Sequence, residues 1–261
     1  MSRPKEQRFR LHRPAKGGKT TAMIFDPPLI PATLVQRYKR FLFDAVLENG
    51  EAITGFCPNT GSMLGLNAPG SRIWLSEHEI GPTRKYRYRF ELIEVDGIVV
   101  GINAAMANRF AEEALTARLV PGLERYTVLK REQKYGKKSR IDFLLAENGL
   151  PDAYIEVKNV HFTRQPGLAE FPDTATARGA RHLEEMGDMV EAGHRAVMLY
   201  LIQRPDCHRL AIAGDLDPVY ARAYDRAVAR GVEVRAVRCA ITHREIRAET
   251  AVPIDDRARA V

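Results

Sequence analysis

The stretch Ser139-Arg140-Ile141-Asp142-Phe143, followed by Tyr154-Ile155-Glu156-Val157-Lys158-Asn159, decides how the second half of this chain is expected to fold. Both runs are β-branched or aromatic around their charged members. Between them, Glu147-Asn148-Gly149 and Pro151-Asp152 supply residues that are common in turns. The pattern predicts a β-hairpin whose two strands pair directly.

The charged residues of this hairpin are expected to form a metal-dependent site. Side chains two apart on a strand share a face, so Glu156 and Lys158 point the same way, beside Asp142 on the paired strand. Adjacent carboxylates repel each other, and a divalent cation such as Mg²⁺ or Mn²⁺ removes that cost. Lys158 would then orient or deprotonate an attacking water, or offset charge in the transition state. The alternative is an exposed, salt-bridged hairpin, but the apolar neighbours favour buried strands, where charges are costly unless they are functional.

Asp142, then thirteen residues, then Glu156-Val157-Lys158 resembles the PD-(D/E)XK nuclease signature, with Ile141 where that name has proline. Several further motifs extend the similarity over roughly residues 28 to 240, to the bacterial and archaeal sugar fermentation stimulation protein A (SfsA) family. These motifs are Arg37-Tyr38-Lys39-Arg40-Phe41, Cys57-Pro58-Asn59-Thr60-Gly61-Ser62-Met63, Lys134-Tyr135-Gly136, the two hairpin strands and Phe171-Pro172-Asp173. The resemblance implies an N-terminal OB-like β-barrel domain followed by a restriction-endonuclease-like α/β domain, α+β overall, with DNA as the partner.

The expected domain organisation has three parts: a basic tail at 1–22, an OB-like nucleic-acid-binding domain at 23–100 and a PD-(D/E)XK nuclease-like domain at 101–261. The tail carries seven basic residues and one acid, so it accounts for +6 of the formal net charge of +7. Net charge is therefore weak evidence for a nucleic-acid partner of the folded part. We expect the tail to be disordered, and it could either grip phosphates or aid solubility.

Basic residues of the expected barrel are candidates for binding nucleic acid. From Lys85 to Glu91 they alternate with aromatic residues, which on a strand places the cations on one face and the rings on the other. OB-folds hold single strands with cations on phosphates and rings on bases. The alternative is a solvated strand face above core aromatics. The candidate cations of this domain are Arg37, Lys39, Arg40, Lys85, Arg87 and Arg89.

The loop Cys57–Leu66 is rich in glycine and in small polar residues, and two interpretations of it stay open. It could cradle a phosphate, although it lacks the lysine and the length of a P-loop. It could equally form a structural turn. Cys57 is interpreted as a packed residue rather than a nucleophile, because no histidine lies near it in the sequence.

Four residues outside the hairpin complete the predicted site. The resemblance favours Glu113, on the helix predicted for Ala104–Arg118, as an assisting catalytic glutamate. Asp173 is expected to join Asp142 and Glu156 as a metal ligand. Arg178 and His182 lie four apart on the next predicted helix, so they share a face that could meet a scissile phosphate. An ordinary polar helix face is the alternative for this pair.

Later segments read as strands and helices in alternation, which predicts an α/β core with helices on both faces. Three widely spaced cysteines suggest neither a disulfide framework nor a zinc site, and a reducing cytoplasm fits. Neither a secretory signal nor a stretch long enough to cross a membrane is recognised, so no membrane partner is expected.

The functional prediction is a cytoplasmic DNA-binding protein with a Mg²⁺- or Mn²⁺-dependent nuclease site, with RNA not excluded as substrate and a homodimer left open. The main alternative is a DNA-binding transcriptional regulator of sugar metabolism whose nuclease fold is catalytically silent. A third alternative is an interaction protein that binds no nucleic acid.

Overall fold

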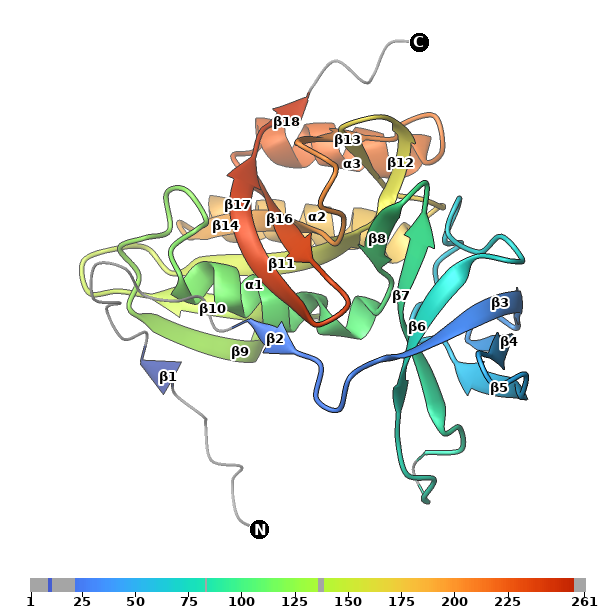
Figure 1. Ribbon diagram of the computed structural model, residues 1–261. Helices are drawn as coiled ribbons and strands as arrows, with labels where there is room; N and C mark the ends of the chain where they lie inside the picture. Colours follow the sequence, from blue (N-terminus) through green and yellow to red (C-terminus); the bar gives the residue numbers. More distant parts are fainter. Residues whose placement is uncertain (1–8, 11–21, 83, 136–138, 256–261) are drawn as a thin grey trace.

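The computed structural model describes residues 9–10, 22–82, 84–135 and 139–255. A small β-barrel lies beside a larger domain in which helices cover both faces of a mixed sheet (Figure 1). This arrangement confirms the predicted fold class, an OB-like barrel followed by an α/β domain. Most of the predicted tail, and with it the prediction of disorder, lies outside the described residues.

The barrel is closed by a pairing between β5 and β7. Its strand order is β5-β4-β3-β6-β7-β8, and a further parallel pairing of β5 with β7, at Phe56 and Arg89, completes the circle. Alternate side chains turn inward; the rings of Phe43 and Phe90 pack at 5.2 Å between centroids. The strands are β3 (Ile30–Tyr38), β4 (Leu42–Leu47), β5 (Ala52–Phe56), β6 (Arg72–Glu77), β7 (Tyr88–Val95) and β8 (Ile98–Gly101).

Two basic segments of the barrel are less regular than their sequence predicts. Strand β3 ends at Tyr38, and Lys39 and Arg40 form a turn with φ of 48° and 65°. Strand β7 begins only at Tyr88, so Lys85 precedes it. Within β7 the predicted alternation holds from Tyr88 to Phe90, where both rings are buried and Arg89 is partly exposed, and it ends at Glu91, which is buried.

The large sheet has the order β1-β9-β10-β11-β14-β16-β17-β2. Its centre, β11-β14-β16, is parallel, and β14 is buried along nearly its whole length, as expected for a strand covered on both faces. The predicted hairpin is confirmed, since β10 and β11 pair antiparallel. The strands are β1 (Phe9–Arg10), β2 (Met23–Ile24), β9 (Val128–Tyr135), β10 (Ser139–Ala146), β11 (Ala153–Val160), β14 (Arg195–Ile202), β16 (Glu233–Ile241) and β17 (Glu245–Val252).

Helix α1 (Ala107–Thr116), preceded by the short 3₁₀ helix η1 (Ala104–Met106), covers one face of the large sheet. Helices α2 (Ala177–Glu191) and α3 (Pro218–Ala229) cover the other (Figure 1). Side-chain caps begin both: Thr176 accepts from the Gly179 amide, and Asp217 accepts from the Tyr220 amide. In the described part of the chain, no helix is long and apolar enough to cross a membrane.

A small sheet lies beside α3, with the order β12-β13-β15-β18. Arg164 braces it through ion pairs to Glu170 of β13 and to Asp215. Its strands are β12 (Phe162–Gln165), β13 (Leu168–Phe171), β15 (Arg209–Ile212) and β18 (Ile254–Asp255).

Apolar contacts fix the barrel against the large domain. Trp74 and Leu92, on the outside of β6 and β7, belong to the core beneath α1. The Trp74 ring stacks on His243, in the β16–β17 turn, at 4.1 Å between centroids. Strand β2 pairs with β17, so the first residues assigned to the N-terminal domain, Met23–Ile24, lie in the large sheet.

Candidate functional site

The β10–β11 ladder opens at the predicted site. Paired residues run as far as Phe143 opposite Ile155. Beyond that point the Val157 amide donates to Asp142 Oδ2 at 2.7 Å. A carboxylate thus occupies the position of a ladder carbonyl, and the Asp142 side chain lies in the opening between the two strands.

Asp142 is held from two sides. Its Oδ1 accepts a 2.8 Å hydrogen bond from Asn108 Nδ2 on α1, and its Oδ2 accepts from the Val157 amide. Burial raises the pKa of Asp142, and the negative charge of Glu156 raises it further. The two carboxylates therefore interact, as the hairpin prediction required.

Glu156 is 4% exposed and has one satisfied and one unsatisfied oxygen. Oε1 accepts from Lys158 Nζ at 2.7 Å and from His182 Nδ1. Oε2 is buried and has no hydrogen-bond partner in the described part of the chain. Burial acts to raise the pKa of Glu156, but the His182 hydrogen bond and the Lys158 charge outweigh it, so this pKa is lowered. The group is therefore an anion with a free buried oxygen.

His182 positions Glu156. It is 3% exposed, its Nδ1 contacts Glu156 Oε1, and its Nε2 accepts from Arg178 Nε at 3.3 Å. With Nε2 as acceptor, the ring proton on Nδ1 is the one donated to the carboxylate. Burial keeps His182 from a phosphate in solvent, so its role differs from the predicted nucleic-acid contact, whereas Arg178 is exposed.

Two residues at the site had no predicted role. Asn108 orients Asp142, and Tyr135 has a buried hydroxyl with no partner among the described residues. Burial raises the pKa of Tyr135 strongly, with Glu156 as the next cause, which places the ring near the carboxylate. Tyr135 belongs to the Lys134-Tyr135-Gly136 motif, the one signal in the sequence that could have identified it.

Glu113 faces away from this site, toward β17. It accepts from the Ala248 amide, and its other oxygen is buried without a partner in the part of the chain that the structure describes. Burial raises the pKa of Glu113 to about 7. Its nearby charges are those of Arg109, Arg247 and Glu245. The residue that α1 directs at Asp142 is Asn108, because Glu113 lies on a different face of the helix.

Asp173 lies at the junction between the domains. Its Oδ2 accepts from the Met63 amide at 2.9 Å, and its backbone carbonyl accepts from Ser62 Oγ at 2.8 Å. His161 Nε2 is 3.7 Å from Oδ2. Burial acts to raise the pKa of Asp173, but His161 and the loop donors outweigh it and lower it. Asp173 therefore anchors the Cys57–Leu66 loop, which favours the structural interpretation of that loop.

Among the described residues, no group of three or more His, Cys, Asp or Glu side chains is arranged to hold a metal ion. The predicted ligand set of Asp142, Glu156 and Asp173 is consequently not assembled. The structure brings Asp142 and Glu156 together, and Lys158 donates a hydrogen bond to Glu156.

Several predicted nucleic-acid cations have structural partners. Arg37 Nη2 donates to the carbonyls of Arg40, Asn59 and Gly61 at 2.6–2.8 Å, and Arg40 Nε donates to the Thr60 carbonyl. These bonds shape the Cys57–Leu66 loop. In the same domain, Arg87 pairs with Glu77 and Arg89 pairs with Glu91.

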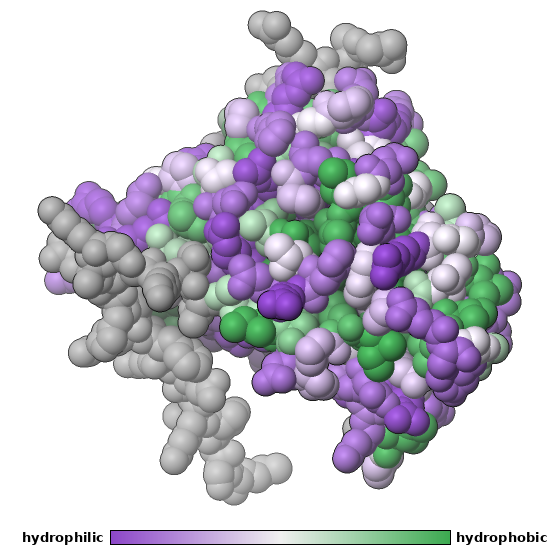
Figure 2. Space-filling view, viewed as in Figure 1, coloured by the Kyte–Doolittle hydropathy of each residue, from purple (hydrophilic) through white to green (hydrophobic). Residues whose placement is uncertain are grey.

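The exposed rings of the barrel differ from those of the predicted stripe. Tyr88 and Phe90 are buried, whereas Phe41 is 42% and Phe56 38% exposed. The Cys57 amide donates to the Phe41 carbonyl, so the two phenylalanines lie close together. On the face seen in Figure 1, apolar surface occurs as separate patches among hydrophilic side chains, some of it over the barrel (Figure 2).

Comparisons with known proteins agree with this architecture. Residues 35–102 match the SfsA N-terminal OB domain, and residues 105–245 match the sugar fermentation stimulation protein RE domain. The sugar fermentation stimulation protein homolog of Agrobacterium fabrum is 66% identical over 239 residues, 92% of this chain and 100% of that protein. The Rhizobium meliloti homolog is 64% identical over 241 residues, with the same coverage. The structure of Pyrococcus furiosus SfsA in complex with Ca²⁺ is similar, with a TM-score of 0.80 at 25% identity over 89% of this chain and 98% of that one.

Proposed function

The chain belongs to the sugar fermentation stimulation protein family, and on this premise we propose that it is a nucleic-acid-binding protein with a Mg²⁺-dependent phosphodiesterase site. Asp142 and Glu156 hold the metal ion, and Lys158 acts beside it. The observation that carries the proposal is the buried, unpartnered Oε2 of Glu156 next to a second carboxylate. Lys158 pairs with Oε1 only, so the lone pairs of Oε2 remain for a metal cation.

The donor set fits a hard divalent cation. Glu156 Oε2 has no partner in the described part of the chain, and each oxygen of Asp142 accepts only one N–H, which leaves lone pairs for a metal ion. Mg²⁺ is commonly bound by one or two carboxylates and keeps several waters, so a third carboxylate is not required. The Pyrococcus furiosus relative was solved with Ca²⁺, another cation that takes oxygen ligands. When bound, such an ion lowers the pKa of a coordinated water and polarises a phosphoryl oxygen.

The surrounding side chains orient the reacting groups. His182 and Asn108 fix the carboxylates in place by hydrogen bonds. The Lys158 side chain is 16% exposed and gives one N–H to Glu156, so its remaining donors are available to an attacking water or a phosphate oxygen. Arg178 and Arg181 are exposed on α2, where they can contact the flanking phosphates.

The test compares wild type with Lys158→Ala on labelled single-stranded, duplex and branched DNA and RNA, with Mg²⁺, Mn²⁺ or EDTA. We expect metal-dependent cleavage that falls by about 100-fold or more in the variant, because Lys158 contacts the reacting groups. Lys130→Ala, on the neighbouring strand β9, serves as the control and should retain activity. Equal cleavage by Lys158→Ala would contradict the proposal.

Binding without cleavage across the whole panel would favour the alternative, a DNA-binding transcriptional regulator of sugar metabolism with a silent nuclease fold. The exposed rings of Phe41 and Phe56 favour nucleic-acid binding under either proposal, since bases stack on accessible aromatic side chains. Replacing both by alanine should weaken single-strand affinity about tenfold or more. Val35→Ala, at an exposed position of β3, is the matched control.

A further inference from the structure

A cavity of about 300 Å³ lies where the barrel meets the large domain. Its walls come from residues 23–29, from β6 and β7, and from the start of α1. This volume is at the lower end of the range for small-molecule sites, which are frequently found between domains. None of Asp142, Glu156 and Lys158 lines it, so it is separate from the site described above.

A fully bonded carboxylate fixes the polar wall of this cavity. Glu91 is 2% exposed and accepts from Arg89 Nε at 2.5 Å, from Ser76 Oγ at 2.6 Å and from Asn103 Nδ2 at 2.7 Å. Both of its oxygens are satisfied. Glu91 therefore sets the orientation of Arg89 and Ser76 rather than binding a ligand itself.

The same bonds determine the tautomer of His78. The single hydroxyl proton of Ser76 is donated to Glu91, so the 2.8 Å contact between Ser76 Oγ and His78 Nε2 requires an N–H on that nitrogen. Burial lowers the pKa of His78, and the charges of Arg89 and Arg84 lower it further against the opposing effect of Glu91. Burial and the two arginines therefore favour the neutral form of this ring. The cavity is also lined by Asp26 and by Glu77, whose charge is paired with Arg87.

Two guanidinium groups at the cavity have unused donors. Arg89 bonds through Nε, and its two Nη groups have no partner among the described residues. Arg109, on α1, is exposed and makes no hydrogen bond in the part of the chain that the structure describes. Paired guanidinium groups suit a planar or tetrahedral oxyanion. Phe25, Leu29 and Met106 add apolar side chains to the lining of the same cavity.

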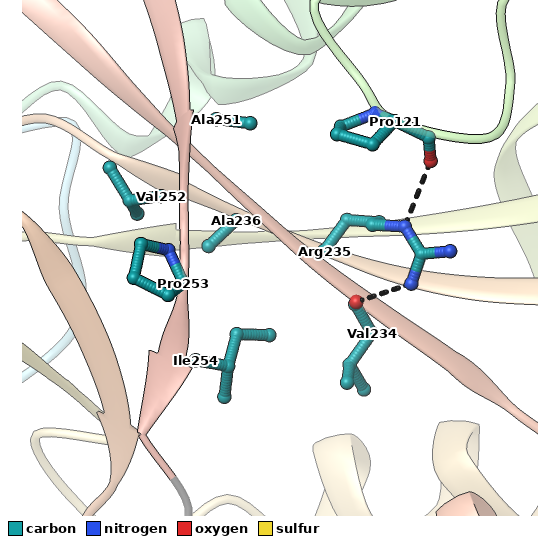
Figure 3. Close-up of a pocket in the computed structure, with 8 residues that line it drawn as sticks. All are labelled: Pro121, Val234, Arg235, Ala236, Ala251, Val252, Pro253 and Ile254. Carbon is teal, nitrogen blue, oxygen red and sulfur yellow. Dashed lines mark hydrogen bonds between the residues drawn. The ribbon is translucent and has the colours of Figure 1, made fainter.

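A second cavity, of about 320 Å³, lacks the free polar groups that a ligand-binding site needs. It lies between Pro121, the start of β16 and the end of β17, and Arg235 lines it and reaches toward Pro121 (Figure 3). That guanidinium already donates to the carbonyls of Pro121 and Val234 and to Glu233. The remaining lining is alanine, valine, isoleucine and proline, so no polar group is available to select a ligand.

We propose that the junction cavity binds a phosphate monoester attached to a ring, of the size of a nucleoside monophosphate. The phosphate lies between Arg89 and Arg109, and the ring packs on Phe25, Leu29 and Met106. The ligand chemistry is shared by a free nucleotide and by the phosphorylated 5′ end of a strand. Arg109 directly follows Asn108, so the bound phosphate lies next to the helix residue that orients Asp142.

Methionine methyl groups report this binding directly. Of the seven methionines, Met23 and Met106 line the cavity. We would label the methionine methyls with ¹³C and titrate the full chain with adenosine monophosphate in EDTA, so that metal-dependent binding at the hairpin site does not contribute. The Met23 and Met106 signals should move and the Met186 and Met198 signals should stay. No movement of the first two, or equal movement of all four, would overturn the proposal.

Parallel titrations test the contributions of the phosphate and the ring one at a time, and they distinguish a free nucleotide from the 5′ end of a strand. Inorganic phosphate and adenosine should each bind at least tenfold more weakly than the monophosphate; if either binds equally well, one half of the cavity does not contribute and the proposal fails. A 5′-phosphorylated trinucleotide distinguishes a strand end from a free nucleotide, and binding of either supports the cavity. Arg109→Gln should lower affinity at least tenfold, whereas Arg222→Gln, at an exposed position of α3, should leave it unchanged. Unchanged affinity in Arg109→Gln would also overturn the proposal.

Discussion

Two buried glutamates in this molecule have opposite surroundings. Glu91, at the domain junction, is 2% exposed and both of its oxygens accept hydrogen bonds, from Arg89, Ser76 and Asn103. Glu156, in the large sheet, is 4% exposed, and its Oε2 has no partner in the described part of the chain. It also lies near a second carboxylate, Asp142.

The difference separates a structural carboxylate from a binding one. A buried anion with a full set of donors is stable as it stands and holds its neighbours in place. A buried anion with an unpartnered oxygen and a like-charged neighbour has lone pairs to offer to a metal cation. Burial alone would not have distinguished Glu91 from Glu156; the distinction lies in the partners of each oxygen.

The same substitution at both positions tests this contrast and should give the largest effect. Glu91→Gln should cost about 3 kcal/mol, because the charge beside Arg89 is lost and an amide N–H₂ faces the donor of Asn103. Asn103 cannot flip freely, since its Oδ1 accepts from the Ala105 amide. Glu156→Gln keeps an acceptor for Lys158 and His182 and relieves repulsion with Asp142, which offsets much of the loss of the charge that Lys158 stabilises, so it should cost only about 1 kcal/mol. Urea unfolding at neutral pH, without metal, measures both.

Equal losses at the two positions would show that the free oxygen of Glu156 is of no consequence. A greater loss at Glu156 than at Glu91 would reverse the contrast altogether.

Metal-dependent stabilisation should give the next largest effect. At a Mg²⁺ concentration ten times its Kd, the wild type should gain about 1.4 kcal/mol, which corresponds to about 3 °C in Tm. Asp142→Asn should abolish the shift because it removes one of the two carboxylates. Asp173→Asn should keep it, since that side chain accepts from the Met63 amide at the junction. Thermal unfolding monitored by intrinsic fluorescence, with and without Mg²⁺, gives the answer, and loss of the shift in Asp173→Asn would restore Asp173 to the ligand set.

The smallest predicted effect on stability comes from Glu113. Like Glu156, this carboxylate has one oxygen with a hydrogen-bond partner and one without among the described residues. Its pKa of about 7, raised by burial from 4.5, means that the folded state favours the protonated form. Protonated Glu113 therefore makes its full contribution to the free energy of unfolding below pH 4.5, and this contribution is lost as the pH rises through 7. Because the carboxyl is partly exposed, the loss is discounted for solvent screening to about 1 kcal/mol.

Glu113→Gln, which resembles the protonated form, should consequently be more stable than wild type at pH 8 and similar at pH 5. Urea midpoints at the two pH values measure this difference, with Glu79→Gln, at an exposed position, as the control. A wild-type stability that does not change between pH 5 and pH 8 in a Glu113-dependent way would contradict the assignment.

The hairpin and its carboxylate–lysine cluster were predictable because their geometry is local. A turn between two apolar runs fixes the pairing, and the two-residue period of a strand then places Glu156 and Lys158 on one side. The two helices that follow the hairpin, α2 and α3, were equally accessible, since Thr176 and Asp217 mark where they begin. Each of these signals acts within a few residues along the chain.

The errors and omissions arise where distant segments meet. Which face of α1 meets β10 depends on how the helix packs. Asn108 and Glu113 lie about 140° apart around the helix axis, so only one of them can face Asp142. The contact between Asp173 and Met63 joins residues 110 positions apart, through docking of two domains. Arg37 looked available for phosphates, but its hydrogen bonds to loop carbonyls exist only after the barrel closes. Sequence periodicity carries no information on such contacts.

The pairing of β2 with β17 has a consequence for how this molecule can be divided. The first two described strands, β1 and β2, lie in the large sheet. After Ile24 the chain builds the barrel and returns to the large domain through η1 and α1. In topological terms the barrel is thus an insertion into the larger domain. A fragment that starts after the barrel would lack β2 and expose the outer edge of β17, where unpaired backbone groups invite association between chains. A deletion of the barrel alone would keep Met23–Ile24 paired with β17 and so leave that edge protected.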